Sequence, residues 1–215
     1  MTCKLFPLML ALVLALSLTA ALAEDFDGFY DFDATYGLDT DINLILTPDG
    51  HGRLINSTSS INFDFTVEDN RLVPTVDADK LTLELDGNGR VTATVTGIPL
   101  QFIKRADVDG GEDIVGTWSA TGMESGGITY GSEMLTLAGI RLDATFYPSG
   151  AVSWHAVTDS DSTLAQGWGV DGEGFYVHNG AALLRLTLDG DTLTLVHPGD
   201  GNSQGEVKYI FERAE

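Results

Sequence analysis

The sequence has little cysteine, little proline and few basic residues. Its single cysteine is Cys3, so the rest of the chain can form no disulfide and offers no thiolate for catalysis or metal binding. Ten of the 11 basic residues and all 32 acidic residues follow residue 23, which gives that part of the chain a net charge of −22. This charge makes nucleic acid and anionic membrane surfaces poor partners. The acids are scattered along the chain with no block of five or more, a pattern that favours a solvated surface over a cation-binding role.

Long apolar runs are absent except near the N-terminus. Lys4 precedes an apolar run from Leu5 to Leu18, and Ala21-Leu22-Ala23 has the small residues of a signal-peptide cleavage site. The run is short for a membrane span, so we expect residues 1–23 to be a signal peptide cleaved after Ala23. A retained N-terminal anchor is the alternative. The expected localisation is secreted or extracytoplasmic.

A β-hairpin pattern occurs twice in the chain. Residues 81–88 read LTLELDGN, and residues 184–191 read LRLTLDGD. Leucines that alternate with polar residues predict a strand with one buried face, and Asp-Gly favours a tight turn with positive φ angles. Segments before and after the hairpin also recur in the same order, so the chain contains two copies of one small domain.

The repeat, together with the absence of helical periodicity, predicts an all-β protein of two tandem small antiparallel β-barrels. We expect the first barrel in residues 24–107, a linker at 108–114 and the second barrel in residues 115–215. A single fused barrel is the structural alternative. In the first copy, eight short strands are expected near 28–34, 41–47, 52–56, 61–67, 72–76, 81–85, 90–96 and 100–105.

The second copy contains an insertion from Thr121 to Gly139, where the first copy has only Leu38 to Thr40. Ser132 has the side chain of a helix N-cap, and Gly139 suits the position just past a helix end. The insertion therefore predicts one short helix over 132–138.

Residues repeated at the ends of the two copies resemble those of lipocalin-like small β-barrels, and in particular the tandem lipocalin-like repeats of secreted bacterial proteins. They are Gly116, Trp118 and Arg213 in the second copy, and Gly28, Tyr30 and Lys104 in the first. The resemblance implies that the first-strand aromatic residue packs against the last-strand basic residue at the closed end of the barrel. A guanidinium can stack on an aromatic ring and bind backbone carbonyls, so we expect Arg213 to lie on Trp118 in a structural role.

Motifs for catalysis and metal binding are missing from the sequence. The four histidines lack the short spacings of a zinc site, and there is neither a Gly-x-Ser-x-Gly nucleophile motif nor a phosphate-binding glycine loop. A pair of catalytic carboxylates can be brought together by the fold without any motif in the sequence. A small hydrolase is therefore kept as the least favoured function. We expect a non-enzymatic protein without cofactor or metal.

Aromatic side chains of the second copy form the candidate ligand site. A barrel mouth lined by Trp154, Trp168, Phe175, Tyr176 and His155 would accept a small apolar or amphipathic molecule. Barrels of eight strands are filled by side chains or hold one small ligand, so a packed core is the alternative. The sequence thus predicts a secreted binding protein of unknown ligand. The alternative is a cell-surface interaction or adhesion module with filled barrels and an extracellular protein as partner.

Overall fold

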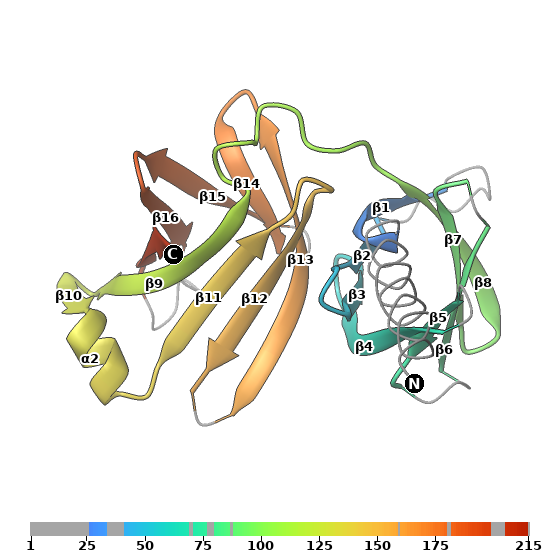
Figure 1. Ribbon diagram of the computed structural model, residues 1–215, viewed down its shortest axis with the longest axis horizontal. Helices are drawn as coiled ribbons and strands as arrows, with labels where there is room; N and C mark the ends of the chain where they lie inside the picture. The colour runs from blue at the N-terminus through green and yellow to red at the C-terminus, as the bar shows by residue number, and fades with distance from the viewer. Residues whose placement is uncertain are drawn as a thin grey trace, which may run out of the picture.

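The computed structural model describes residues 26–33, 41–68, 71–76, 80–86, 88–158, 160–179, 182–198 and 205–214. Within these residues the chain forms two closed antiparallel barrels of eight strands, one after the other along the sequence (Figure 1). The predicted all-β fold with tandem barrels and a short helix in the second barrel is confirmed, and the alternative of one fused barrel is wrong. The expected signal peptide lies outside the described residues.

The first barrel closes because its first strand pairs with its last. β1 lies between β2 and β8, so each strand of this barrel has two neighbours. All eight predicted strands are present, with ends within a few residues of those expected. They are β1 (Gly28–Phe32), β2 (Asn43–Leu46), β3 (His51–Ile55), β4 (Ser60–Glu68), β5 (Arg71–Pro74), β6 (Leu81–Leu85), β7 (Arg90–Val95) and β8 (Ile98–Lys104).

The second barrel closes in the same way, through pairing of β9 with β17, and carries β10 as an additional strand beside β9. Its elements are β9 (Gly116–Ser125), β10 (Ile128–Gly131), α2 (Ser132–Leu137), β11 (Arg141–Phe146), β12 (Ala151–Val157), β13 (Asp161–Asp171), β14 (Gly174–Asn179), β15 (Ala182–Asp189), β16 (Thr192–His197) and β17 (Val207–Arg213).

Equivalent backbone hydrogen bonds show that the two barrels are copies of one design. In the first barrel, the amide of Phe65 on β4 donates to the carbonyl of Gly50, which follows β2, at 2.8 Å. In the second barrel, the amide of Trp168 on β13 donates to the carbonyl of Gly150, which follows β11, at the same distance. Gly50 and Gly150 both have positive φ angles, 88° and 80°, which a side chain would disfavour. The repeat read from the sequence is therefore a repeat in three dimensions.

An aromatic side chain on the first strand of each barrel is fully buried and fixed by the same contact. The Tyr30 hydroxyl donates to the carbonyl of Phe26 at 2.8 Å, and Trp118 Nε1 donates to the carbonyl of Ile114 at 2.8 Å. In both barrels the acceptor lies four residues earlier in the chain. Because a buried donor without a partner is costly, this bond favours the aromatic residue in its inward position.

Arg213 contacts Trp118, as the resemblance to lipocalin-like barrels implied. Its guanidinium carbon lies 4.4 Å from the centre of the Trp118 ring. The same group donates to the carbonyls of Val115 and Asp113. A Cβ atom at Gly116 would lie 2.9 Å from Arg213 Nη1, so the glycine leaves room for the guanidinium.

Lys104 takes the corresponding place in the first barrel. It pairs with Tyr30 across β1 and β8, as Arg213 pairs with Trp118. A Cβ atom at Gly28 would lie 2.9 Å from Lys104 Cε. The lysine therefore fills the space above a first-strand glycine, as the arginine does in the second barrel.

The insertion of the second copy forms more structure than expected. α2 is present and ends as predicted, because the amides of Gly139 and Ile140 bond back to the last helical turn and Gly139 has a φ angle of +67°. The prediction that Ser132 is the N-cap is wrong: the cap is Gly131, which makes no side-chain hydrogen bond. Extended backbone of β10 runs directly into the helix, so no separate capping turn precedes it.

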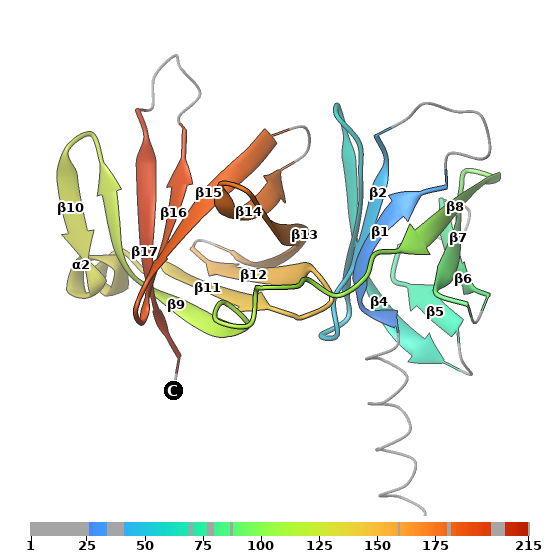
Figure 2. The same cartoon turned by 90° about the horizontal axis from the view of Figure 1, so that it is seen from above.

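The two barrels pack side by side through their outer faces (Figure 2). Two carboxylates of the first barrel accept hydrogen bonds from serines of the second, Asp27 from Ser149 at 2.5 Å and Asp49 from Ser153 at 2.8 Å. The contact also contains an apolar cluster with members from both barrels: Phe29, Ile45, Ile55, Tyr147, Ala151 and Ala165.

The expected linker is packed against the second barrel. The amide of Val108 donates to the carbonyl of Pro148 at 2.9 Å, and Gly111 lies so close to Trp168 that a Cβ atom there would be 2.5 Å from its ring. Ile114 is fully buried in the core of the second barrel. This segment is therefore part of the second barrel's packing rather than an extended linker.

Substitution of Gly167 by alanine should loosen the contact between the barrels. A Cβ atom at this position would lie 2.8 Å from the Phe29 ring, and such overpacking costs about 1–3 kcal/mol. All three tryptophans lie in the second barrel, so their fluorescence reports that barrel while circular dichroism reports both. We expect the two signals to coincide during urea unfolding of the parent protein and to separate in Gly167→Ala.

Gly172→Ala is the matched control, because a Cβ atom there meets nothing within 4 Å. Its two unfolding curves should coincide at the parent midpoint. Unchanged unfolding of Gly167→Ala would show that the Phe29 contact does not couple the barrels.

Candidate functional site

The residues predicted to line a ligand site point to two different sides of the second barrel. Trp154 and Trp168 are 7% and 2% exposed and lie in the core, with Phe175 packed against them. Tyr176 and His155 follow inward-facing residues along their strands and therefore point outward. The structure thus separates the five residues into an interior group and two outer residues.

The interior group is packed edge to face with other aromatic rings. The ring centre of Phe146 lies 5.7 Å from that of Trp168 and 6.0 Å from that of Trp154. Trp154 also lies 5.9 Å from Phe211 of β17. These distances are typical of aromatic pairs in protein cores, so the rings fill the space between the strands.

One polar atom in this core makes no bond within the described residues. Trp168 Nε1 donates to the carbonyl of Tyr147 at 2.8 Å, but Trp154 Nε1 is buried and has no hydrogen-bond partner there. A buried indole N–H normally has an acceptor. Trp154 is therefore the one predicted ligand residue whose interior position leaves a bonding capacity unused.

His155 lies on the outer surface, away from the tryptophans. Its Nδ1 is 3.2 Å from the hydroxyl of Thr163, and its Nε2 is 3.5 Å from a carboxylate oxygen of Asp161. Both neighbours lie on β13 beside β12. These contacts suit a surface residue on a β-sheet and give His155 no link to Trp154.

Tyr176 belongs to a column of rings and charges at the junction of the barrels, which the sequence did not predict. The ring centre of His178 lies 5.3 Å from Tyr176 and 4.9 Å from Phe29 of the first barrel. Arg105 stacks on the Phe29 ring, with its guanidinium carbon 3.8 Å from the ring centre, and it binds both carboxylate oxygens of Asp31. The column therefore joins β14 to the first barrel.

Two hollows flank this column. One of about 250 Å³ is lined by Phe29, Arg105 and Tyr176 among others, and one of about 390 Å³ by Asp31, Arg105 and His178 among others. Burial, and to a smaller extent the charge of Arg105, lowers the pKa of His178 to about 4. The imidazole is therefore neutral near pH 7, and the positive charge beside these hollows is that of Arg105, paired with Asp31.

The insertion of the second barrel has three of the four most exposed large apolar side chains of the described residues. Leu137 is 88% exposed, Ile128 56% and Met134 52%. We call these three residues the insertion surface. Outside the insertion only Ile98, at 61%, reaches a similar exposure among the residues described. Apolar side chains gathered in so short a segment are typical of a contact with another molecule.

α2 covers the outer face of the second barrel that is equivalent to the face through which the first barrel contacts its neighbour. Leu135 of α2 is buried over the outer face of β9 and β11, at the paired residues Ser119 and Asp143. The equivalent pair in the first barrel is Asp31 and Asn43, and that pair faces β14 of the second barrel. The insertion thus takes the place that a neighbouring barrel has in the first copy.

Comparison with protein-family models, with curated proteins and with solved structures found no match. Within the described residues there is no group of three or more His, Cys, Asp or Glu side chains that could hold a metal ion. No helix in the described part of the chain has the length and apolar character needed to cross a membrane.

The pKa of His178 predicts how acid affects the barrel junction. Its value is about 4 in the folded protein and 6.5 as an ordinary histidine, so the unfolded chain binds more protons between these values. The stability contributed by neutral His178 is complete above about pH 6.5 and is lost as the pH falls to about 4. Urea midpoints measured across this range should decline in the parent protein and decline less in His178→Gln.

The comparison of the two proteins isolates His178 from other groups. Asp27 also titrates at the junction, because burial raises the pKa of its carboxyl, but it does so in both proteins. Parallel pH profiles would mean that His178 is not the group responsible.

Proposed function

We propose that the chain is an exported, non-enzymatic interaction module that binds another protein through the insertion surface of its second barrel. The observation that carries the proposal is the exposure of Ile128, Met134 and Leu137 in a segment that the first copy lacks. Isolated apolar side chains on a surface are ordinary, but a local group on an added element suits a contact site.

The packed barrel interiors support this choice over catalysis. Catalytic residues are usually placed on loops around a cleft, whereas here the aromatic side chains fill the second barrel. We further propose that the barrels are lipocalin-like and that the protein is exported through the signal peptide expected in residues 1–23. The contact of Arg213 with Trp118 supports the first proposal, and the apolar run before Ala23 supports the second.

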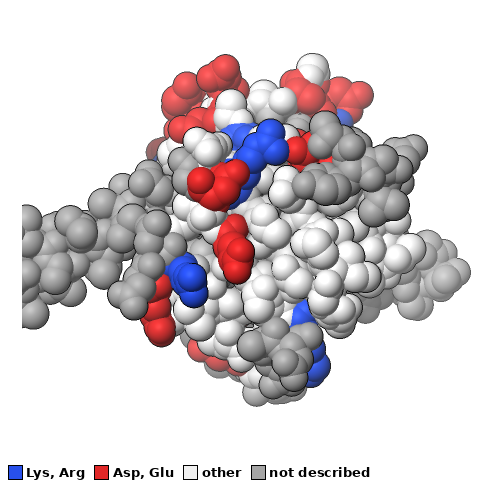
Figure 3. All heavy atoms as spheres, turned by 90° about the vertical axis from the view of Figure 1, so that its right-hand side faces the viewer, with Lys and Arg blue, Asp and Glu red and all other residues white. Residues whose placement is uncertain are grey.

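On the face of the first barrel drawn in Figure 3, the charged side chains of the described residues do not form an equally distinct site. The face of the first barrel seen in Figure 3 has acidic and basic residues scattered among uncharged ones. Such a mixture is what a solvated surface requires. This supports placing the contact on the second barrel.

A photo-crosslinking amino acid placed at Leu137 tests the proposed contact. In cells that naturally make the protein, we expect a discrete adduct with one partner, since Leu137 is 88% exposed on α2. The same amino acid at Ile98 is the matched control, because Ile98 is 61% exposed on the first barrel. Excess parent protein should suppress the adduct, whereas a Met134→Asp, Leu137→Asp variant should not. Equal adducts from both positions, or none from Leu137, would contradict the proposal.

A second candidate function is the binding of a small molecule within the second barrel. It is favoured by the buried Trp154 Nε1, which has no acceptor among the described residues. A ligand oxygen, or an internal water, would complete this bond. Native mass spectrometry of the purified protein should detect a co-purifying molecule that is lost in Trp154→Phe. If the mass of the parent protein equals that of the polypeptide alone, with no bound molecule, ligand binding in the barrel is contradicted.

A further inference from the structure

We infer that the free edge of β10 is a strand-addition site for an extended partner segment rich in lysine or arginine. This inference rests on the proposed function, because it places the partner at the insertion surface. It goes further by naming the binding mode and the chemistry of the partner.

β10 is the only strand with a single neighbour among the strands described. Every other strand described has at least two neighbours, because both barrels are closed, and β9 has three. β10 pairs with β9 alone and lies at the end of the molecule away from the first barrel (Figure 2). An unpaired strand edge has free N–H and C=O groups that pair readily with an added strand.

The register of the hairpin identifies the backbone groups at this edge. Gly126 and Gly127, both with positive φ angles, form the two-residue turn between Ser125 and Ile128. In such a hairpin the pair that flanks the turn is hydrogen-bonded, and the next pair directs its backbone groups away from the partner. That next pair is Glu124 and Thr129. The N–H and C=O of Thr129 therefore point toward the free edge.

β10 is short but lacks the charged residue or proline that often protects an edge strand. Its sequence, Ile-Thr-Tyr-Gly, contains no charge and no proline, whereas exposed edges commonly carry lysine or proline. Ile128 is exposed on the strand itself, and Met134 and Leu137 are exposed on the helix that follows directly. A strand of four residues offers few backbone bonds, so apolar contacts with these side chains would supply much of the affinity.

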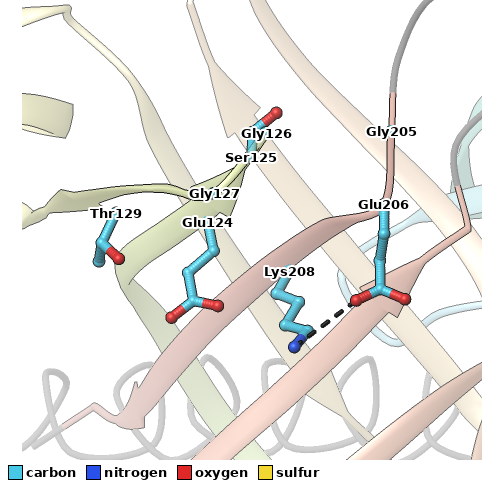
Figure 4. A pocket seen from close by; sticks show the side chains of 8 residues that line it. All are labelled: Glu124, Ser125, Gly126, Gly127, Thr129, Gly205, Glu206 and Lys208. Atoms are coloured by element: carbon cyan, nitrogen blue, oxygen red, sulfur yellow. Dashed lines mark ion pairs between the residues drawn. The ribbon is translucent and has the colours of Figure 1, made fainter.

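Charge on the outer face of this edge favours a basic partner. Thr129, Glu124 and Lys208 lie side by side on β10, β9 and β17, around a hollow of about 470 Å³ (Figure 4). Lys208 forms an ion pair with Glu206 at 3.5 Å, and among the described residues no ion pair of Glu124 is found. Strands are about 4.8 Å apart, and a long basic side chain on an added strand can reach across the short Thr129 to Glu124.

A second copy of the protein is a poorer occupant of the edge. Residues 121–140 contain two acids, Glu124 and Glu133, and no lysine or arginine, and the whole chain has a net charge of −21. Pairing of two copies would bring like charges together, which opposes association. A segment rich in lysine or arginine is instead attracted by the net negative charge of the protein.

The test measures binding of a short synthetic peptide of alternating valine and lysine to the full chain, by fluorescence anisotropy at low and high salt. We expect binding that weakens with salt, and no binding of the corresponding valine–glutamate peptide. Thr129→Pro removes the edge N–H without removing a bond to β9, and it should weaken binding about tenfold. Glu124→Gln should weaken binding less and reduce its dependence on salt.

Thr129→Ser is the matched control, because it keeps the backbone N–H, and it should bind as the parent does. Equal binding of Thr129→Pro and the parent would overturn strand addition, and equal binding of the acidic peptide would overturn the basic partner. Self-association of the parent in sedimentation, lost in Thr129→Pro, would make a second copy the occupant and also overturn the inference. If the Leu137 adduct persists in Thr129→Pro, the interaction surface stands and the binding mode alone is wrong.

Discussion

Closure of each sheet by its own first and last strands is the constraint on which the rest of the structure depends. β1 pairs with β8 and β9 pairs with β17, so neither barrel leaves an edge of its own. At each closure a buried Tyr30 or Trp118 donates to a carbonyl four residues earlier, which ties the start of the barrel to its wall. A closed, filled barrel can meet other molecules only through outer faces, loops or added elements.

Equivalent outer faces have different uses in the two copies. Phe29 and Ile45 of the first barrel are buried against the second barrel. Their counterparts in the second barrel are Thr117 and Thr145, whose hydroxyls form a hydrogen bond with each other at 3.1 Å. A contact between two unlike surfaces can continue into a chain of copies unless one surface changes. The threonines and α2 change that surface in the second barrel, so the two barrels present different outer faces at equivalent places.

Alternation in the sequence was sufficient to predict the strands and the repeat, and the resemblance to lipocalin-like barrels implied the contact of Arg213 with Trp118. It did not predict the junction, because period-two alternation distinguishes two faces of a strand without showing what covers the outer one. The signal was the unbroken apolar run Leu44-Ile45-Leu46, which is typical of a strand buried on both faces. His178 was missed for the same reason, since it lies outward on β14 and is covered by Phe29 of the other barrel.

The insertion shows where local signals conflict. Gly126-Gly127 is a known hairpin turn, but the residues before it, Thr-Gly-Met-Glu-Ser, do not alternate, so β10 was not expected. Ser132 was assigned as the N-cap because a polar residue before a helix usually follows a loop, whereas here extended Gly131 precedes it directly. Strand and helix are thus joined without a loop.

This direct join has a consequence for binding. β10 is tied to the barrel through β9, and α2 is tied to it through the buried Leu135, so neither element can move far without the other. The free strand edge and the exposed Met134 and Leu137 are therefore held in a fixed relation to one another. A partner that engages both loses little conformational freedom of the protein on binding, and this pre-organisation favours affinity even where the paired strand is short.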